Sequence, residues 1–298
     1  MSHPLPEFSE APGTSTPALA SLDILKYPRT PHLEGSRLQP GDEAGGQLAL
    51  ASLAGRHAVI EEKLDGANAA VSFTGAGELR LQSRGHALAG GGRERQFAPL
   101  WRWARAHEGA LLERLEDRYV MYGEWLYAKH SVSYDALPHW FCEFDVFDRV
   151  AGVFLSTPRR RALLAGSPVV SVPVLCEGPM PRSVKALRSM VGPSLAKTAR
   201  WQDAFEGAVR RQGLDLALAW KQTDRSTLAE GLYAKLEDEV QVLARAKWVR
   251  PDFVQTILES GSHHSARPIV PNGLAAGVDL YAPVPAVGWP AVAPAQGA

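Results

Sequence analysis

A lysine that precedes an Asp-Gly turn lies in the first quarter of the chain, within residues 61–68 (EEKLDGAN). Residues 57–63 (HAVIEEK) place apolar and β-branched residues ahead of the two glutamates, which predicts a strand ending at the lysine. The amine would then project from the edge of a sheet into the cleft above it. A deprotonated lysine in such a place is a nucleophile suited to covalent catalysis. Residues 63–66 (KLDG) taken alone are more typical of a surface turn with an exposed lysine.

Five further segments rich in charged and aromatic residues follow in order. They are residues 83–85 (SRG), 122–125 (YGEW), 141–147 (FCEFDVF), 230–235 (EGLYAK) and 245–248 (RAKW). Each lies within or at the end of a run that is dense in β-branched and aromatic residues, which favours strands. Their order after Lys63 is informative, because strands that converge in a sheet would bring them to one cleft.

With Lys63, these segments resemble the six ordered motifs of the covalent nucleotidyltransferase superfamily of ligases and mRNA-capping enzymes. The likeness is greatest to ATP-dependent RNA ligases of the phage RNA ligase 2 type, and it spans about residues 25–250. The resemblance implies an ATP-grasp-like ligase adenylation domain, ATP as substrate, and Mg²⁺ or Mn²⁺ as metal. It also implies RNA with 5′-phosphate and 3′-hydroxyl ends as the partner, with a nicked duplex among the candidate forms.

The resemblance assigns catalysis to Lys63, which would form a lysyl–AMP intermediate, and to Glu230, Arg245 and Lys247. Lysine attacks only when deprotonated, although its ordinary pKa is about 10.4, and nearby positive charge lowers that value. Arg245 and Lys247 are two residues apart on a predicted strand and therefore share a face. We expect them to lower the Lys63 pKa and, by resemblance, to hold the α-phosphate. They would otherwise form an exposed basic strand face.

The same resemblance places further residues around the nucleotide. Glu124 is expected near the ribose and, with Glu230, near a divalent metal, since Mg²⁺ accepts few carboxylates together with phosphate oxygens and water. Phe144 would stack on the adenine, with Phe141 as the alternative if the strand register differs. The other expected nucleotide-binding residues are Glu62 at the adenine amino group, Lys63, Asp65 in the turn, Asn68 at a phosphate or metal-bound water, Arg84 at the ribose or acceptor phosphate, and Lys247.

The elements that must position these residues are mostly strands. Alternation and turn residues predict strands at 57–63, 68–73, 78–83, 119–127, 140–148, 230–236 and 239–248. An apolar repeat of helical period covers 94–117, and shorter ones cover 183–191 and 200–212. This pattern predicts an α+β fold of antiparallel sheets flanked by helices.

Composition narrows the class of protein. The 298 residues carry 32 basic and 32 acidic side chains, so the net charge is zero and bulk attraction to nucleic acid is not expected. Residues 155–211 nevertheless hold ten Lys or Arg against three acids, a candidate surface for a nucleic-acid strand. No apolar stretch approaches the ~20 residues that span a bilayer, and no membrane partner is expected. Two cysteines and the absence of a signal pattern predict a cytoplasmic location.

We expect a disordered arm over residues 1–20, an adenylyltransferase domain over 21–260, and a Pro/Ala-rich, weakly ordered tail over 261–298. The 48 residues from 251 to 298 leave little room for the further domain that DNA ligases and capping enzymes carry. A protein partner that supplies it is therefore one expectation. Three alternatives stay open: a capping-type guanylyltransferase, a DNA ligase, and a non-catalytic fold that binds RNA ends.

Overall fold

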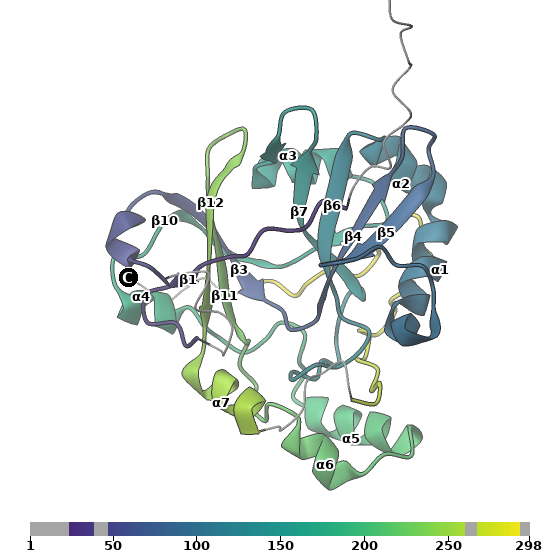
Figure 1. Ribbon diagram of the computed structural model, residues 1–298. Coiled ribbons are helices and arrows are strands. Elements are labelled where there is room, and N and C mark those ends of the chain that lie inside the picture. Colours follow the sequence, from purple (N-terminus) through teal and green to yellow (C-terminus); the bar gives the residue numbers. More distant parts are fainter. Residues whose placement is uncertain (1–23, 39–46, 260–266, 293–298) are drawn as a thin grey trace, which may run out of the picture.

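Two mixed, mainly antiparallel sheets face each other in the centre of the molecule (Figure 1). The computed structural model describes residues 24–38, 47–259 and 267–292. Helices lie against the outer sides of the sheets, and a small helical unit lies below them (Figure 1). The predicted α+β class is confirmed. The arm expected over residues 1–20 lies outside the described residues.

The first sheet carries the lysine strand in its interior. Its order is β10-β3-β11-β12-β1-β2. The strands are β10 (Val174–Pro179), β3 (His57–Lys63), β11 (Gly231–Glu237), β12 (Val242–Val249), β1 (His32–Leu33) and β2 (Gln47–Leu48). Lys63 is the last residue of β3 and pairs with Gly231, whereas Lys247 on β12 pairs with Tyr233 on β11. Strand pairing thus brings the predicted segments 61–63, 230–235 and 245–248 side by side.

The second sheet carries the remaining predicted segments. Its order is β5-β4-β6-β7-β8, and β9 pairs with β7. The strands are β5 (Leu79–Ser83), β4 (Ala67–Phe73), β6 (Tyr119–Trp125), β7 (Phe141–Asp148), β8 (Val153–Phe154) and β9 (Val170–Ser171). Asn68 on β4 pairs with Glu124 on β6. Because paired residues share a face, both side chains point to the same side of the sheet.

Alternation along the strands separates an apolar face from a polar face in each sheet. In the first sheet, Ile60, Leu232 and Ala246 pack in a buried cluster with Leu187 of α4 (Val184–Ser189). The opposite face, with Glu61 and Lys63, looks toward the second sheet. Two-residue periodicity therefore places the chemistry between the sheets and the apolar cores outside them.

The helices differ from the prediction in their ends and number. The predicted helix over 94–117 is divided into the 3-10 segment η3 (Gly92–Phe97), α1 (Ala98–Ala106) and α2 (Glu108–Leu115). His107 lies between α1 and α2 with φ −112° and ψ 15°, outside helical values. The predicted helices over 183–191 and 200–212 are α4 and α5 (Trp201–Arg211). Helices α3 (Thr157–Leu164), α6 (Leu216–Lys221) and α7 (Pro251–Glu259), and the 3-10 turn η2 (Leu50–Ser52), were not predicted.

A buried network of six charged side chains joins the two sheets. Its acids are Glu61, Glu143 and Asp145, and its bases are Arg160, Lys235 and Arg245. Arg160 on α3 bridges Glu143, at 2.9 Å, and Glu61; Lys235 bridges Glu61 at 2.9 Å and Asp145 at 3.3 Å. Three acids are thus paired with three bases away from water, as buried ions require. We call these six residues the inter-sheet charge network.

The tail expected over 261–298 is described between residues 267 and 292. This stretch contains isolated β-bridges but no strand or helix. It nevertheless packs against the domain through specific hydrogen bonds, and the composition did not indicate this packing. Within the described residues, no helix has the length and apolar character needed to cross a membrane.

Candidate active site

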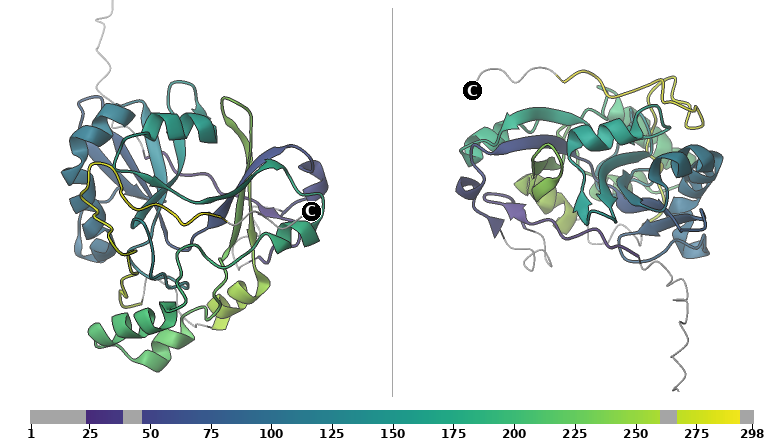
Figure 2. Two further views of the ribbon diagram at one scale, coloured as in Figure 1. Left: turned by 180° about the vertical axis from the view of Figure 1, so that it is seen from behind. Right: turned by 90° about the horizontal axis from the view of Figure 1, so that it is seen from above.

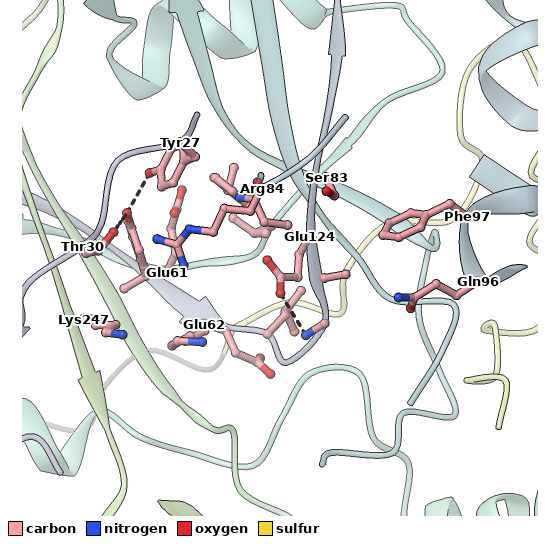
Figure 3. A pocket seen from close by; sticks show the side chains of 18 of the residues that line it. Tyr27, Thr30, Glu61, Glu62, Ser83, Arg84, Gln96, Phe97, Glu124 and Lys247 are labelled. Carbon is pink, nitrogen blue, oxygen red and sulfur yellow. Dashed lines mark hydrogen bonds between the residues drawn. The ribbon is translucent and has the colours of Figure 1, made fainter. Parts of the chain in front are cut away.

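A cavity of about 590 Å³ opens between the polar faces of the two sheets. Seven of the residues predicted for nucleotide binding line it: Glu62, Lys63, Asn68, Arg84, Glu124, Phe144 and Lys247. In Figure 3, Tyr27, Thr30 and Lys247 lie on one side of the pocket and Gln96 and Phe97 on the other. Segments separated by up to about two hundred residues in sequence thus meet in one site.

Lys63 forms the central ion pair of the pocket. Its Nζ donates to Glu230 Oε2 at 2.8 Å, and the lysine side chain is 23% exposed. Burial lowers the Lys63 pKa. The carboxylates of Glu230, Glu124 and Asp65 together raise it by more, so the pKa lies above its ordinary value. Burial also raises the Glu230 pKa, to about 7, against the opposing effect of Lys63. Lys63 is therefore held as a cation in the free protein, and Glu230 Oε2 is the carboxylate oxygen nearest to its amine protons.

Glu124 lies beside this pair on the second sheet. Its Oε1 accepts from the Gly66 backbone N–H at 2.9 Å (Figure 3), and burial raises its pKa to about 7. Its strand partner Asn68 has an Oδ1 that is buried without a hydrogen-bond partner. An unpaired oxygen of this kind costs free energy unless a ligand or water donates to it. The wall formed by Asn68 and Glu124 is thus suited to a polar ligand.

The same residues fit a divalent cation of the magnesium type. Glu124 and Glu230 both hold raised pKa values, which a nearby cation would relieve. Across the described ranges there is no group of three or more His, Cys, Asp or Glu side chains that could hold a metal. Mg²⁺ commonly binds through one or two carboxylates plus substrate phosphates and water. The donors therefore suit a metal that arrives with a phosphate ligand.

The turn after Lys63 is held by the loop between β6 and β7. Asp65 Oδ2 accepts from the backbone N–H groups of Ser131 and Val132 at 2.6 and 2.7 Å, and the Asp65 N–H donates to Tyr134 Oη at 2.8 Å. Asp65 was expected to orient this turn and was counted among the nucleotide-binding residues. It anchors the turn and lies outside the residues that line the cavity.

Phe144 reaches the pocket because of a β-bulge. Tyr122 pairs with Asp145 and Gly123 pairs with Glu143, which leaves Phe144 as the extra residue. Its ring lies edge-on to Tyr27 with a centroid distance of 5.1 Å. The alternative, Phe141, is fully buried and stacks against Trp103 in the apolar core. Of the two aromatic residues, Phe144 alone lines the cavity.

Positive charge lines the other walls. Lys247 is half-buried on β12 and lowers the pKa of Glu230, whereas Arg84 is exposed at the end of β5. His86 lies at the same rim, and its Nδ1 is 2.9 Å from Ser83 Oγ. The pocket therefore offers a cation beside Lys63 and a second basic region at its mouth. This distribution fits a ligand with several phosphates.

Two predicted residues have different surroundings from those expected. Arg245 is bound to Asp145 at 2.8 Å, belongs to the inter-sheet charge network and does not line the cavity. The carboxylates beside Lys63 raise its pKa, whereas Arg245 and Lys247 were expected to lower it. Glu62 points to the face opposite Lys63, where its oxygens accept from Ser194 Oγ at 2.6 Å and Leu195 N–H at 3.0 Å. Glu62 thus borders the cavity, but its carboxylate is bound to Ser194 and Leu195.

Other pocket residues were not singled out. Tyr27 and Thr30 come from the leading segment of the described chain, and both contact Tyr233 Oη, at 2.7 and 2.9 Å. Gln96 and Phe97 come from η3. The first pair lies outside the six sequence motifs. The second pair could not be recognised from the sequence, because helical spacing does not distinguish a residue that lines a pocket from one that packs in the core.

Lys129, in the loop that holds Asp65, gives a prediction for stability. Burial lowers its pKa to about 7, helped by Arg267, whereas in an unfolded chain the value is about 10.4. Between these values the unfolded chain holds a proton that the folded chain lacks, so stability should rise with pH by up to about 1.4 kcal/mol per pH unit. Denaturant titrations from about pH 7 to pH 9 should show that the free energy of unfolding of the wild type rises with pH relative to that of Lys129→Met. A constant difference would contradict the assignment.

Comparison with known proteins gives a family and a fold. A model of the RNA ligase family matches residues 56–249. A Naegleria gruberi RNA ligase mutant with ATP and Mn has a TM-score of 0.50 and 17% identity, covering 78% of this chain and 58% of that chain. A second such mutant with ATP and Mn has a TM-score of 0.48, 16% identity and coverages of 70% and 54%. The family match and the first of these structural likenesses confirm the fold of an RNA ligase domain.

This chain spans a little over half the length of those ligases, 58% and 54% in the two comparisons. A third Naegleria gruberi RNA ligase mutant, with AMP and Mn, has a TM-score of 0.47 and 16% identity over 69% of this chain and 53% of that chain. Among curated protein sequences, none matches this chain significantly.

Proposed function

This chain belongs to the RNA ligase family, and we propose that it is an ATP-dependent ligase that joins RNA ends through an adenylate on Lys63. The observation that carries the proposal is the Lys63–Glu230 pair, 2.8 Å apart, in a pocket with Phe144 and Lys247. A nucleophile, a proton acceptor, an aromatic wall and a phosphate-binding cation meet there. These are the parts that nucleotidyl transfer to a lysine requires.

In the first step, Lys63 Nζ transfers one proton to Glu230 Oε2, attacks the α-phosphorus of ATP and releases a second proton to water. The N–P bond forms as the bond to the bridging oxygen breaks, and pyrophosphate leaves with that electron pair. Lys247 offsets the charge that builds on the phosphate oxygens, the largest contribution expected in phosphoryl transfer. A divalent cation held by Glu124, with Asn68 toward its water, would supply further positive charge at the phosphates.

Phe144 and Tyr27 form the wall proposed for the adenine. Their edge-on contact fixes the Phe144 ring, so that a flat base can stack on it. The three hydroxyl groups of Tyr27, Thr30 and Tyr233 line the same side and can bond polar atoms of the nucleotide. The ATP and metal named for the Naegleria gruberi ligases agree with this arrangement.

The second and third steps move AMP onto RNA and then release it. A 5′-phosphate oxygen attacks the phosphorus of lysyl–AMP, which returns the electron pair to Lys63 Nζ. A 3′-hydroxyl then attacks the activated 5′-phosphorus, a new phosphodiester forms, and AMP leaves. Arg84 and His86 at the exposed rim are placed for the 5′-phosphate, since an arginine fork suits phosphate oxygens. We propose a cytoplasmic setting, where RNA ends and ATP are both present.

A joining assay tests the proposal. A labelled RNA with a 5′-phosphate is annealed beside an RNA 3′-hydroxyl on a complementary strand, and a single-stranded RNA and a DNA nick are run in parallel. We expect an ATP-dependent sealed product and a transient adenylylated end with RNA. Sealing only of the DNA nick would favour the DNA-ligase alternative. An adduct formed from GTP alone would favour the capping-type alternative.

The Gly66 position gives a specific prediction. A Cβ there would lie 2.6 Å from the Trp125 carbonyl oxygen and 2.9 Å from Leu126 Cδ2, so the turn between Lys63 and Asn68 would have to shift. Displacement of a nucleophile by about 1 Å can lower a reaction rate on the order of 10²-fold, so Gly66→Ala should slow lysyl–AMP formation by about 10- to 100-fold. Gly109→Ala, where a Cβ meets nothing within 4 Å, is the matched control. Equal single-turnover rates in the two variants would contradict the geometry.

A further inference from the structure

Residues 267–292, which we call the C-terminal strap, cross the domain on the side opposite the view of Figure 1 (Figure 2). The strap begins beside the β6–β7 loop, where the Lys129 N–H donates to the Val270 carbonyl at 2.9 Å. It ends near Trp289, whose Nε1 donates to the Ser171 carbonyl at 2.7 Å. A segment without helices or strands is thus attached at both ends to elements that border the candidate site.

Asn272 is the strongest attachment of the strap. It is 3% exposed, and its Nδ2 donates to the Leu126 carbonyl at 2.8 Å while its Oδ1 accepts from the Tyr134 N–H at 3.0 Å. Its backbone N–H donates to the Tyr127 carbonyl at 2.8 Å, and its carbonyl accepts from Trp140 Nε1 at 3.1 Å. All these partners belong to the loop between β6 and β7. One buried amide therefore satisfies backbone groups at both ends of residues 126–134.

That loop in turn holds the nucleophile turn. Ser131 and Val132 donate to Asp65, and Tyr134 Oη accepts from the Asp65 N–H, two residues after Lys63. Tyr134 therefore contacts Asn272 through its backbone and Asp65 through its side chain. A continuous set of hydrogen bonds runs from the strap to the Lys63 turn.

The far end of the strap meets the opposite wall of the pocket. The Ser171 hydroxyl, next to the carbonyl that Trp289 binds, donates to Glu143 at 2.6 Å. The neighbouring Val172 lines the cavity, and Trp289 packs in the same apolar cluster as Val172 and Phe144. The strap therefore contacts the supports of both the lysine turn and the proposed adenine wall.

We propose that Asn272 is a positioning residue for Lys63 and that the C-terminal strap is an integral part of the nucleotide-transfer site. The inference rests on the proposed function. Removal of the Asn272 amide leaves the Leu126 carbonyl and the Tyr134 N–H buried without partners, and the loop must move to rehydrate them. The movement displaces Asp65 and, with it, the amine of Lys63. Trp289 acts in the same way on the wall around Val172 and Phe144.

Single-turnover kinetics of adenylylation distinguish the roles of the two ends of the strap. We expect Asn272→Ala to lower the rate at saturating ATP by about 10- to 100-fold, the cost of a displaced nucleophile, with the half-saturating ATP concentration changed less than about three-fold. Trp289→Phe, which loses the hydrogen bond to Ser171, should instead raise the half-saturating ATP concentration. Val284→Ala, on a side chain that is 52% exposed, is the matched control. A wild-type rate in Asn272→Ala overturns the proposal.

Hydrogen exchange supplies a readout that is independent of chemistry. The amides of Ser131 and Val132, bonded to Asp65, should exchange at least about 10-fold faster in Asn272→Ala than in Val284→Ala, while the β6 and β7 amides keep wild-type rates. Equal acceleration throughout the domain indicates general unfolding and overturns the positioning role. If Asn272→Ala does not fold, Asn272→Asp, which keeps the acceptor for the Tyr134 N–H, is tested in the same way. A wild-type protein that forms no adduct refutes the proposed function, and the exchange rates still decide the role of Asn272.

Discussion

Replacing Lys63 with alanine is expected to reduce the covalent enzyme–AMP adduct by at least about 10³-fold, because Lys63 is the pocket lysine whose amine lies against a proton acceptor, Glu230. Lys63 is the lysine that ends β3 inside the pocket, 2.8 Å from the carboxylate that would accept its proton. The adduct is measured by incubating the protein with ATP labelled on the α-phosphate and a divalent metal, followed by denaturing electrophoresis. Lys221→Ala, on an exposed lysine of α6, should label as the wild type does.

The later chemistry provides a stricter test of the same residue. Sealing of an RNA whose 5′ end is already adenylylated does not need the lysine as nucleophile. Lys63→Ala should therefore keep a measurable part of this activity while losing sealing that depends on ATP. Loss of both activities in a folded variant would indicate that Lys63 serves mainly to hold the nucleic acid or the architecture.

Replacing Arg160 with methionine is expected to lower the free energy of unfolding by about 3–5 kcal/mol, the range for breaking a buried ion pair from one side. Arg160 is fully buried and bridges Glu61 on the first sheet and Glu143 on the second. Without it, the inter-sheet charge network keeps three acids against two bases and an uncompensated negative charge. The sheets that form the two sides of the nucleotide pocket would lose a principal contact.

Urea titration of Arg160→Met and Arg161→Met measures this effect. Arg161 lies next to Arg160 on α3 but is exposed, so its replacement should leave the unfolding midpoint unchanged. Replacement of all six network residues by apolar side chains of similar volume is a different experiment, since it removes every charge together. Equal midpoints for the two single variants would show that the network contributes nothing to joining the sheets.

The features of the site that depend on local pattern could be predicted from the sequence. The strand before Lys63, the Asp-Gly turn and the hairpin of β11 and β12 follow from alternation and turn chemistry, and the structure has all of them. Lys247 reaches the cavity because it shares a strand face with Tyr233 and Glu61. Period two along a strand is a property of the backbone and needs no tertiary information.

The features that depend on packing between distant segments could not be predicted. Arg245 shares the face of Lys247, but Asp145 on the other sheet takes its guanidinium out of the cavity. The choice between Phe141 and Phe144 depends on a bulge that no pattern indicates. Asn272 lies in a Pro/Ala-rich segment whose composition predicts weak order, and only the buried backbone groups of the β6–β7 loop explain its place.

Mapping of the covalent nucleotide by mass spectrometry tests the central claim most directly. The full-length protein is incubated with ATP and Mg²⁺, and in parallel with GTP and Mg²⁺, then digested and sequenced. The structure predicts one adenylyl group, attached through a phosphoramidate to Lys63 and formed from ATP, since Lys63 is the lysine paired with Glu230 in the pocket. An adduct on another residue, a guanylyl group formed in preference, or no adduct at all would contradict it.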